Sequence, residues 1–182
     1  NIPKNMTLEP VQELNFLYQQ NAKEGIAPPY IEGGGDRSMY PWIFMTPFHM
    51  ASIEKNFALR QGFATGYSIS DDGLTYLLHI NADAIYQDGT PITAQSIKDA
   101  WEFAAWPANQ VGWGAILLHT RAIAGMDAVE SGDATAASGL TAIDDVTLEI
   151  KMVKFTPTWP LQMAVWMLGA FKADQAKNDP EG

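Results

Sequence analysis

The chain has no cysteine among its 182 residues, which excludes disulfide bonds, thiolate metal sites and cysteine nucleophiles. It is also poor in positive charge, because 11 Lys and Arg residues stand against 21 Asp and Glu residues, for a formal net charge of −10. Phosphate binding needs clustered Lys and Arg, so we expect no nucleic-acid partner. The sequence has no apolar run of the roughly 18 residues that a membrane-spanning helix needs.

The sequence also lacks the residue groupings of common catalytic and metal sites. Its three histidines, His49, His79 and His119, are isolated and show no metal-ligand spacing. The carboxylate pairs at 71–72 and 144–145 are adjacent residues, which point in different directions and cannot flank one substrate bond. We therefore expect no enzymatic activity, no bound metal and no cofactor.

Apolar and polar residues alternate twice in the middle of the chain, at 63–70 and at 74–80. The turn between the two runs is Asp71-Asp72-Gly73. Two period-two runs joined by a short turn that ends in glycine predict an antiparallel β-hairpin with Gly73 at positive φ. His79 falls on the outer face of the second strand.

A helix with a clear start signal follows the Asp88-Gly89-Thr90-Pro91 turn, where we expect Asp88 to cap the turn and present the helix. Thr93 is a good N-cap, and Ile92 before it can pack against Ile97 as a hydrophobic staple. The inner face of the helix is predicted to carry four residues at helical spacing: Ile97, Ala100, Trp101 and Ala104.

Three further segments complete the expected fold. Apolar residues alternate at 146, 148, 150 and 152, which predicts a strand. Residues 161–171 resemble a buried helix, while 38–50 indicate a buried helix or two turns and 112–128 short helical pieces. The pattern predicts an α+β fold, in which an antiparallel sheet is half covered by helices.

Three stretches carry a resemblance to a known family. They read FATGYSISDDGLTY at 63–76, YQDGTPITA at 86–94 and SGLTAIDDVTLEI at 138–150. In this order and spacing they resemble segments of the peptide- and nickel-type extracellular solute-binding proteins, family five. The chain departs from that pattern at Gln95 and Ser96, where the family usually has acidic residues, and at Asn81, where it usually has a basic one.

The resemblance implies a partial chain that covers part of lobe one of a type II periplasmic-binding-protein-like fold. Residues 1–60 would form the N-terminal segment of that lobe and 61–182 its α+β subdomain, with the second lobe absent. We expect the truncation to uncover apolar surface, with 161–171 as the first candidate for self-association.

By the same resemblance, the protein would be the substrate-binding component of an ABC-type importer. It would capture a peptide or similar small solute and deliver it to a membrane permease. It would be periplasmic or at the cell surface, its signal sequence not being in this chain. The alternative is a ligand-sensing domain of a regulator built on the same fold.

Solute sites are concave and lined with aromatic side chains. Tyr40, Trp42 and Trp113 lie in irregular, Gly- or Pro-flanked surroundings where a side chain can face a cleft. They are the candidate ligand-binding residues. Trp101, by contrast, lies on the amphipathic helix face and is expected in the core.

Overall fold

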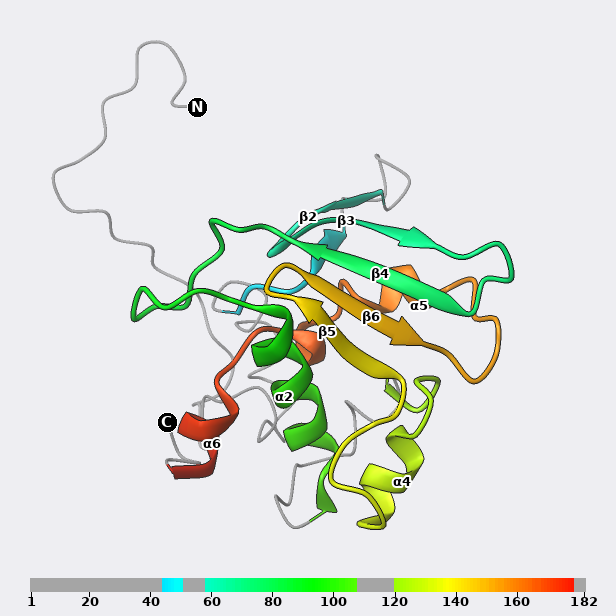
Figure 1. Ribbon diagram of the computed structural model, residues 1–182. Coiled ribbons are helices and arrows are strands. Elements are labelled where there is room, and N and C mark those ends of the chain that lie inside the picture. Colours follow the sequence, from blue (N-terminus) through cyan, green and yellow to red (C-terminus); the bar gives the residue numbers. More distant parts are fainter. Residues whose placement is uncertain (1–43, 51–57, 108–119, 179–182) are drawn as a thin grey trace, which may run out of the picture.

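A four-stranded antiparallel sheet forms the centre of the computed structural model, which describes residues 44–50, 58–107 and 120–178 (Figure 1). Its strand order is β3-β4-β6-β5, so the two hairpins lie side by side through β4 and β6. A separate two-stranded ribbon pairs β1 with β2. The strands are β1 (Phe48–Met50), β2 (Leu59–Gln61), β3 (Ala64–Ile69), β4 (Thr75–Ile80), β5 (Leu140–Asp144) and β6 (Thr147–Lys151).

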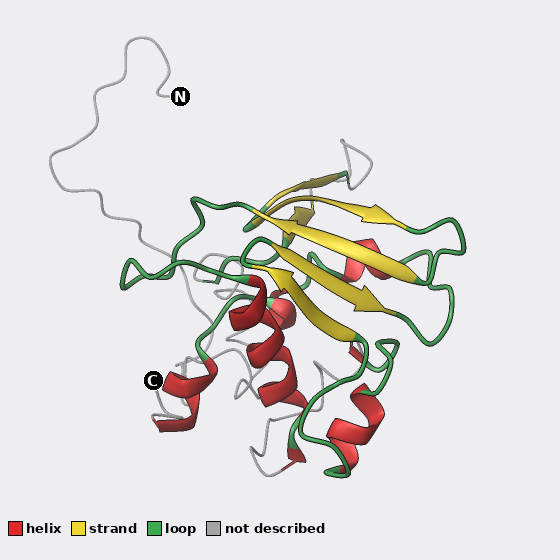
Figure 2. Ribbon diagram, viewed as in Figure 1, coloured by secondary structure: helices red, strands yellow, loops and turns green. Residues whose placement is uncertain are grey.

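The helices gather on one face of this sheet (Figure 2). Helix α2 packs against β5 and β6, and both α4 and α6 contact α2. The sheet and helix layer confirm the predicted α+β class. The helical elements are α2 (Ala94–Ala105), α4 (Met126–Ser131), α5 (Trp159–Gln162), the 3-10 turn η6 (Trp166–Leu168) and α6 (Ala173–Asn178). None of the helices in these ranges is long and apolar enough to cross a membrane.

The predicted hairpin is confirmed as β3 and β4, which pair antiparallel. Gly73 has φ +71° and takes the left-handed position in the turn. The Asp72 carboxylate closes the turn, because its Oδ1 accepts hydrogen bonds from the Ser70 hydroxyl at 2.6 Å and the Leu74 N–H at 2.9 Å. Polar turn chemistry therefore fixes the register that the alternation requires.

Helix α2 begins where the sequence predicts. Thr93 is its N-cap, and Thr93 and Ser96 form a reciprocal capping box. The four residues predicted to face inward are all buried. Within the same helix, buried Glu102 pairs with Lys98 at 2.7 Å and accepts a hydrogen bond from the Ala137 N–H at 2.8 Å, which ties the loop before β5 to α2.

The return strand β6 is confirmed, with one difference at its start. Leu148, Ile150 and Met152 are buried as expected, but Val146 is 37% exposed. Val146 precedes the strand in the β5–β6 turn, where its N–H donates to Asp144 Oδ1 at 2.9 Å. The strand therefore begins at Thr147.

The prediction of one helix at 161–171 is wrong. Helix α5 ends at Gln162, η6 follows, and residues 169–172 have no helical structure. Hydrogen bonds to the distant segment at 45–48 explain the break. The Ala170 N–H donates to the Met45 carbonyl at 2.9 Å, and the Phe48 N–H donates to the Met163 carbonyl at 3.3 Å. Long-range pairing overrides local propensity here.

The described side chains of this segment supply little of the exposed apolar surface expected of it. Met163, Leu168 and Phe171 are buried, and Leu161 is the one strongly exposed apolar side chain among those that the structure describes there, at 42%. Two other predictions need revision. The stretch at 38–50 contains strand β1 in its described part, and within 112–128 helix α4 begins only at Met126; residues 38–43 and 112–119 lie outside the described ranges.

Aromatic side chains link the sheet to the helix layer. The rings of Tyr76 on β4, Trp159 on α5 and Trp101 on α2 are in contact, with centroids 5.5 Å apart for the first pair and 6.3 Å for the second. All three are essentially fully buried. This cluster therefore fixes α2 and α5 against the sheet.

Candidate functional site

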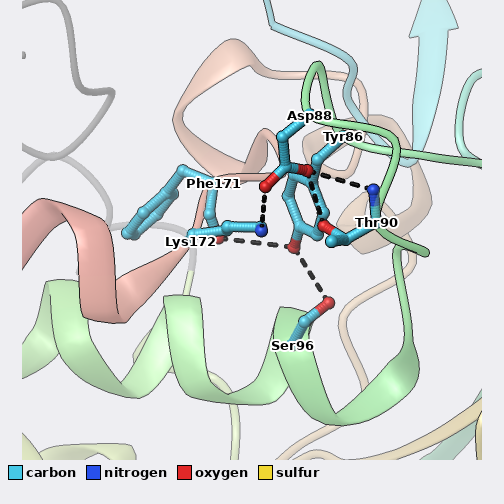
Figure 3. A network of polar contacts seen from close by, with 6 residues as sticks. All are labelled: Tyr86, Asp88, Thr90, Ser96, Phe171 and Lys172. Atoms are coloured by element: carbon cyan, nitrogen blue, oxygen red, sulfur yellow. Dashed lines mark hydrogen bonds and ion pairs between the residues drawn. The ribbon is translucent and has the colours of Figure 1, made fainter.

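A network of polar contacts gathers around the turn at 86–91 (Figure 3). Asp88 Oδ1 accepts hydrogen bonds from the Thr90 N–H at 3.0 Å and the Thr90 hydroxyl at 2.7 Å. Gly89 has φ +83°, a conformation that favours glycine. Asp88 thus caps the turn that leads into α2, as the sequence predicts.

A residue far away in the sequence completes the site. The Lys172 ammonium group forms an ion pair with Asp88 Oδ2 and lies 5.4 Å from the centroid of the Tyr86 ring. The Tyr86 hydroxyl donates to Ser96 Oγ at 2.9 Å, and the same hydroxyl lies 3.4 Å from the Phe171 carbonyl oxygen. The site joins the turn, the first turn of α2 and the segment before α6 (Figure 3).

The charge states of the site favour a structural role. The Lys172 hydrogen bond, followed by those from Thr90, holds the pKa of the Asp88 carboxyl well below its usual range. Burial raises the pKa of the Tyr86 phenol. At neutral pH Asp88 is therefore a carboxylate and Tyr86 is protonated, so neither is poised to exchange a proton with a substrate.

Replacing Asp88 with asparagine is expected to destabilise the fold at pH 7, because Lys172 loses its ion-pair partner. A carboxyl with a depressed pKa stabilises the fold fully above its unfolded pKa, and this contribution is lost as the pH falls. The difference in the free energy of unfolding between wild type and Asp88→Asn should therefore become smaller below about pH 4. It should also become smaller in high salt. Urea denaturation at several pH values and salt concentrations measures it.

The matched control for this experiment is Asp71→Asn, since Asp71 is exposed and has no ion pair in the described structure. It should change stability little at any pH. An Asp88→Asn difference that stays constant from pH 7 to pH 3 would show that the ion pair contributes nothing.

The two carboxylate pairs serve as turn residues, as the spacing argument indicates. Asp72 closes the β3–β4 turn and Asp144 accepts the Val146 N–H in the β5–β6 turn. His79 Nε2 lies 3.2 Å from Ser68 Oγ, across the outer face of the sheet. Across residues 44–50, 58–107 and 120–178, no three His, Cys, Asp or Glu side chains are grouped to hold a metal ion. His119 lies outside those ranges.

The predicted ligand-binding residues stay predictions. Tyr40, Trp42 and Trp113 all lie outside the described residues. The described residues therefore do not show whether these three side chains lie together. The sequence reasoning missed Lys172, which has no local signal because its partner Asp88 lies 84 positions earlier.

Solved structures show which fold this chain has. The chain superposes on the Escherichia coli murein tripeptide binding protein MppA with a TM-score of 0.72 and 21% identity, over 85% of this chain and 30% of that one. Haemophilus influenzae OppA in complex with RPPGFSPFR gives a TM-score of 0.74 and 20% identity, over 85% of this chain and 29% of that one. The fold is that of OppA-like periplasmic binding proteins.

Sequence similarity identifies the family. Residues 58–182 match the bacterial extracellular solute-binding proteins, family 5 (middle region). The chain belongs to this family, and the resemblance noted from its three motifs is confirmed.

Curated relatives are much longer than this chain. Oligopeptide-binding protein OppA of Bacillus subtilis is 30% identical over 134 residues, which cover 73% of this chain and 23% of the relative. Glutathione-binding protein GsiB of Escherichia coli K12 is 34% identical over 75 residues, which cover 41% of this chain and 13% of the relative.

Proposed function

We propose that this chain is part of the substrate-binding component of an ABC-type importer. The protein captures a peptide or similar small solute outside the cytoplasmic membrane, in the periplasm or at the cell surface, and delivers it to a membrane permease. The family match over residues 58–182 carries the proposal. The names of its relatives, an oligopeptide-binding and a glutathione-binding protein, support a peptide-like solute.

By this proposal, the chain contributes two consecutive parts of lobe one. Residues 1–60 form the N-terminal segment of lobe one and residues 61–182 its α+β subdomain. The change from one sheet to the other lies close to this boundary, since β2 ends one residue after it at Gln61 and the four-stranded sheet begins at Ala64. The solute is held by closure of this lobe against a second one, a hinge motion common among periplasmic binding proteins.

The protein binds its solute without turnover, by this proposal. Its described polar clusters support this, because the Asp88 site and the two carboxylate pairs hold turns together. The alternative that the sequence left open is a ligand-sensing domain of a regulator, and the names of OppA and GsiB, both called binding proteins, do not favour it.

Tyr40, Trp42 and Trp113 contact the solute in this proposal. The experiment uses the protein encoded by the longest open reading frame that contains this chain. Replacing Trp113 with alanine in it should weaken peptide binding about tenfold or more, because an aromatic side chain buried against the peptide is worth at least about 1.4 kcal/mol. Isothermal titration with a library of short peptides measures the loss. Tyr40→Ala and Trp42→Ala are tested in parallel.

Phe155→Ala is the matched control, because Phe155 is a large aromatic residue that is 59% exposed beside the β3–β4 turn. Its affinity should equal that of the wild type. If all three candidate variants also bind peptides like the wild type, the assignment of these aromatics is wrong, while peptide binding by the wild type would still support the importer function.

A further inference from the structure

The two edges of the four-stranded sheet differ in how they are protected against pairing. Strand β5 ends at Asp144 and is followed by Asp145, and acidic residues on an edge oppose pairing with another strand. Strand β3 reads ATGYSI and carries no charge and no proline. In a chain of net charge −10, β3 is thus an uncharged edge.

The backbone of β3 presents unpaired groups at two positions. The Ser70 N–H donates to the Thr75 carbonyl, so Ser68 and Ser70 face β4, while Tyr67 and Ile69 direct their N–H and C=O groups away from it. The Thr65 carbonyl is covered by the Gln61 side chain at 3.0 Å. Among the described residues, nothing bonds to the outward backbone groups of Tyr67 and Ile69.

The side chains at these positions are apolar and exposed. Tyr67 is 38% and Ile69 45% exposed, although both lie on the face of the sheet that carries the buried core residues Tyr76 and Leu78. Tyr67 contacts Phe48 and Tyr76 on one side, with centroids 5.9 and 6.0 Å apart. An uncharged edge with apolar side chains, and with backbone groups to which no described residue bonds, is a template for another strand.

We propose that β3 pairs antiparallel with β3 of a second copy of this chain, about a two-fold axis at Ser68. In that register, Tyr67 of each copy lies beside Ile69 of the other, and their outward N–H and C=O groups form four hydrogen bonds. The edge is self-complementary, because each aromatic ring meets a β-branched side chain, a favourable cross-strand pair. The two sheets become one continuous sheet, and the contact is isologous.

The contact is small, so the dimer is weak and reversible, of the transient class of interfaces. Each chain carries a net charge of −10, and the paired edges carry none, so salt screens the repulsion and strengthens the dimer. Sedimentation velocity of the 182-residue chain should show a dimer fraction that rises with protein concentration and with salt. Ile69→Lys places a charge on the edge and should weaken the dimer at least tenfold.

A cross-link tests the register directly. The chain has no native cysteine, and Ser68 faces its own symmetry mate as a non-hydrogen-bonded pair, with Cα atoms about 4.5–5.5 Å apart, within disulfide range. Ser68→Cys should therefore oxidise to a covalent dimer. Thr141→Cys is the control, because Thr141 is exposed on the opposite edge strand. A monomer at every concentration, a dimer that Ile69→Lys leaves intact, or equal cross-linking of both cysteine variants would overturn the proposal.

Discussion

Replacing Trp159 with alanine is expected to lower the free energy of unfolding by about 3–5 kcal/mol, the usual cost of truncating a large buried aromatic residue. Trp159 is fully buried and contacts the rings of Tyr76 and Trp101. Its removal leaves a cavity between the sheet, α2 and α5. Because domains are stable by only about 5–15 kcal/mol, much of the stability is lost. Urea denaturation followed by circular dichroism measures the change.

Leu161→Ala is the control for this variant. Leu161 lies on the same short helix α5, but its side chain is 42% exposed. We expect a loss under about 1 kcal/mol, close to that of ordinary surface substitutions. Equal losses for the two variants would show that the aromatic cluster does not hold α5 to the sheet.

Gly139→Ala is expected to destabilise the fold by about 2–3 kcal/mol, near the upper end of the cost of overpacking. A Cβ at this position would lie 2.6 Å from the Lys151 carbonyl oxygen and 2.8 Å from the Ala124 nitrogen. These are backbone atoms, which cannot rotate away as a side chain can. The Gly139 N–H and C=O are themselves bonded to Ala124 and Lys151, so a shift would also strain two hydrogen bonds of 2.8 Å.

Gly66→Ala provides the comparison, because a Cβ there would meet nothing within 4 Å. It should be neutral or slightly stabilising, since alanine has less freedom in the unfolded chain. The two variants are compared by chemical denaturation at the same low protein concentration. If Gly139→Ala were as stable as Gly66→Ala, the close approach of the three backbone segments would be wrong.

The parts of the fold that follow local rules could be predicted from the sequence. The β3–β4 hairpin depends on period-two alternation and a glycine at positive φ, and α2 depends on the Thr93 cap and one apolar face. These signals lie within about a dozen neighbouring residues. These elements can therefore be read from neighbouring residues, without knowing which distant parts of the chain they contact.

The parts that depend on distant residues could not be predicted. The break after Gln162 follows from a hydrogen bond between Ala170 and Met45, and no local pattern announces it. The ion pair of Asp88 with Lys172 joins the turn at 86–91 to the segment before α6, and only the folded chain brings the two together. The candidate solute residues Tyr40, Trp42 and Trp113 rest on composition and flanking residues alone, and they remain predictions.

The most direct test of the proposed function is a calorimetric titration of short peptides into two proteins in parallel. One is the 182-residue chain, and the other is the protein encoded by the longest open reading frame that contains it. A micromolar site is worth about 8 kcal/mol, and losing half of its contacts leaves about 4 kcal/mol, a millimolar affinity. We expect micromolar peptide binding by the longer protein and millimolar or no measurable binding by the chain alone. No peptide binding by the longer protein would contradict the proposed function, and equal micromolar binding by both would place the whole site within these 182 residues.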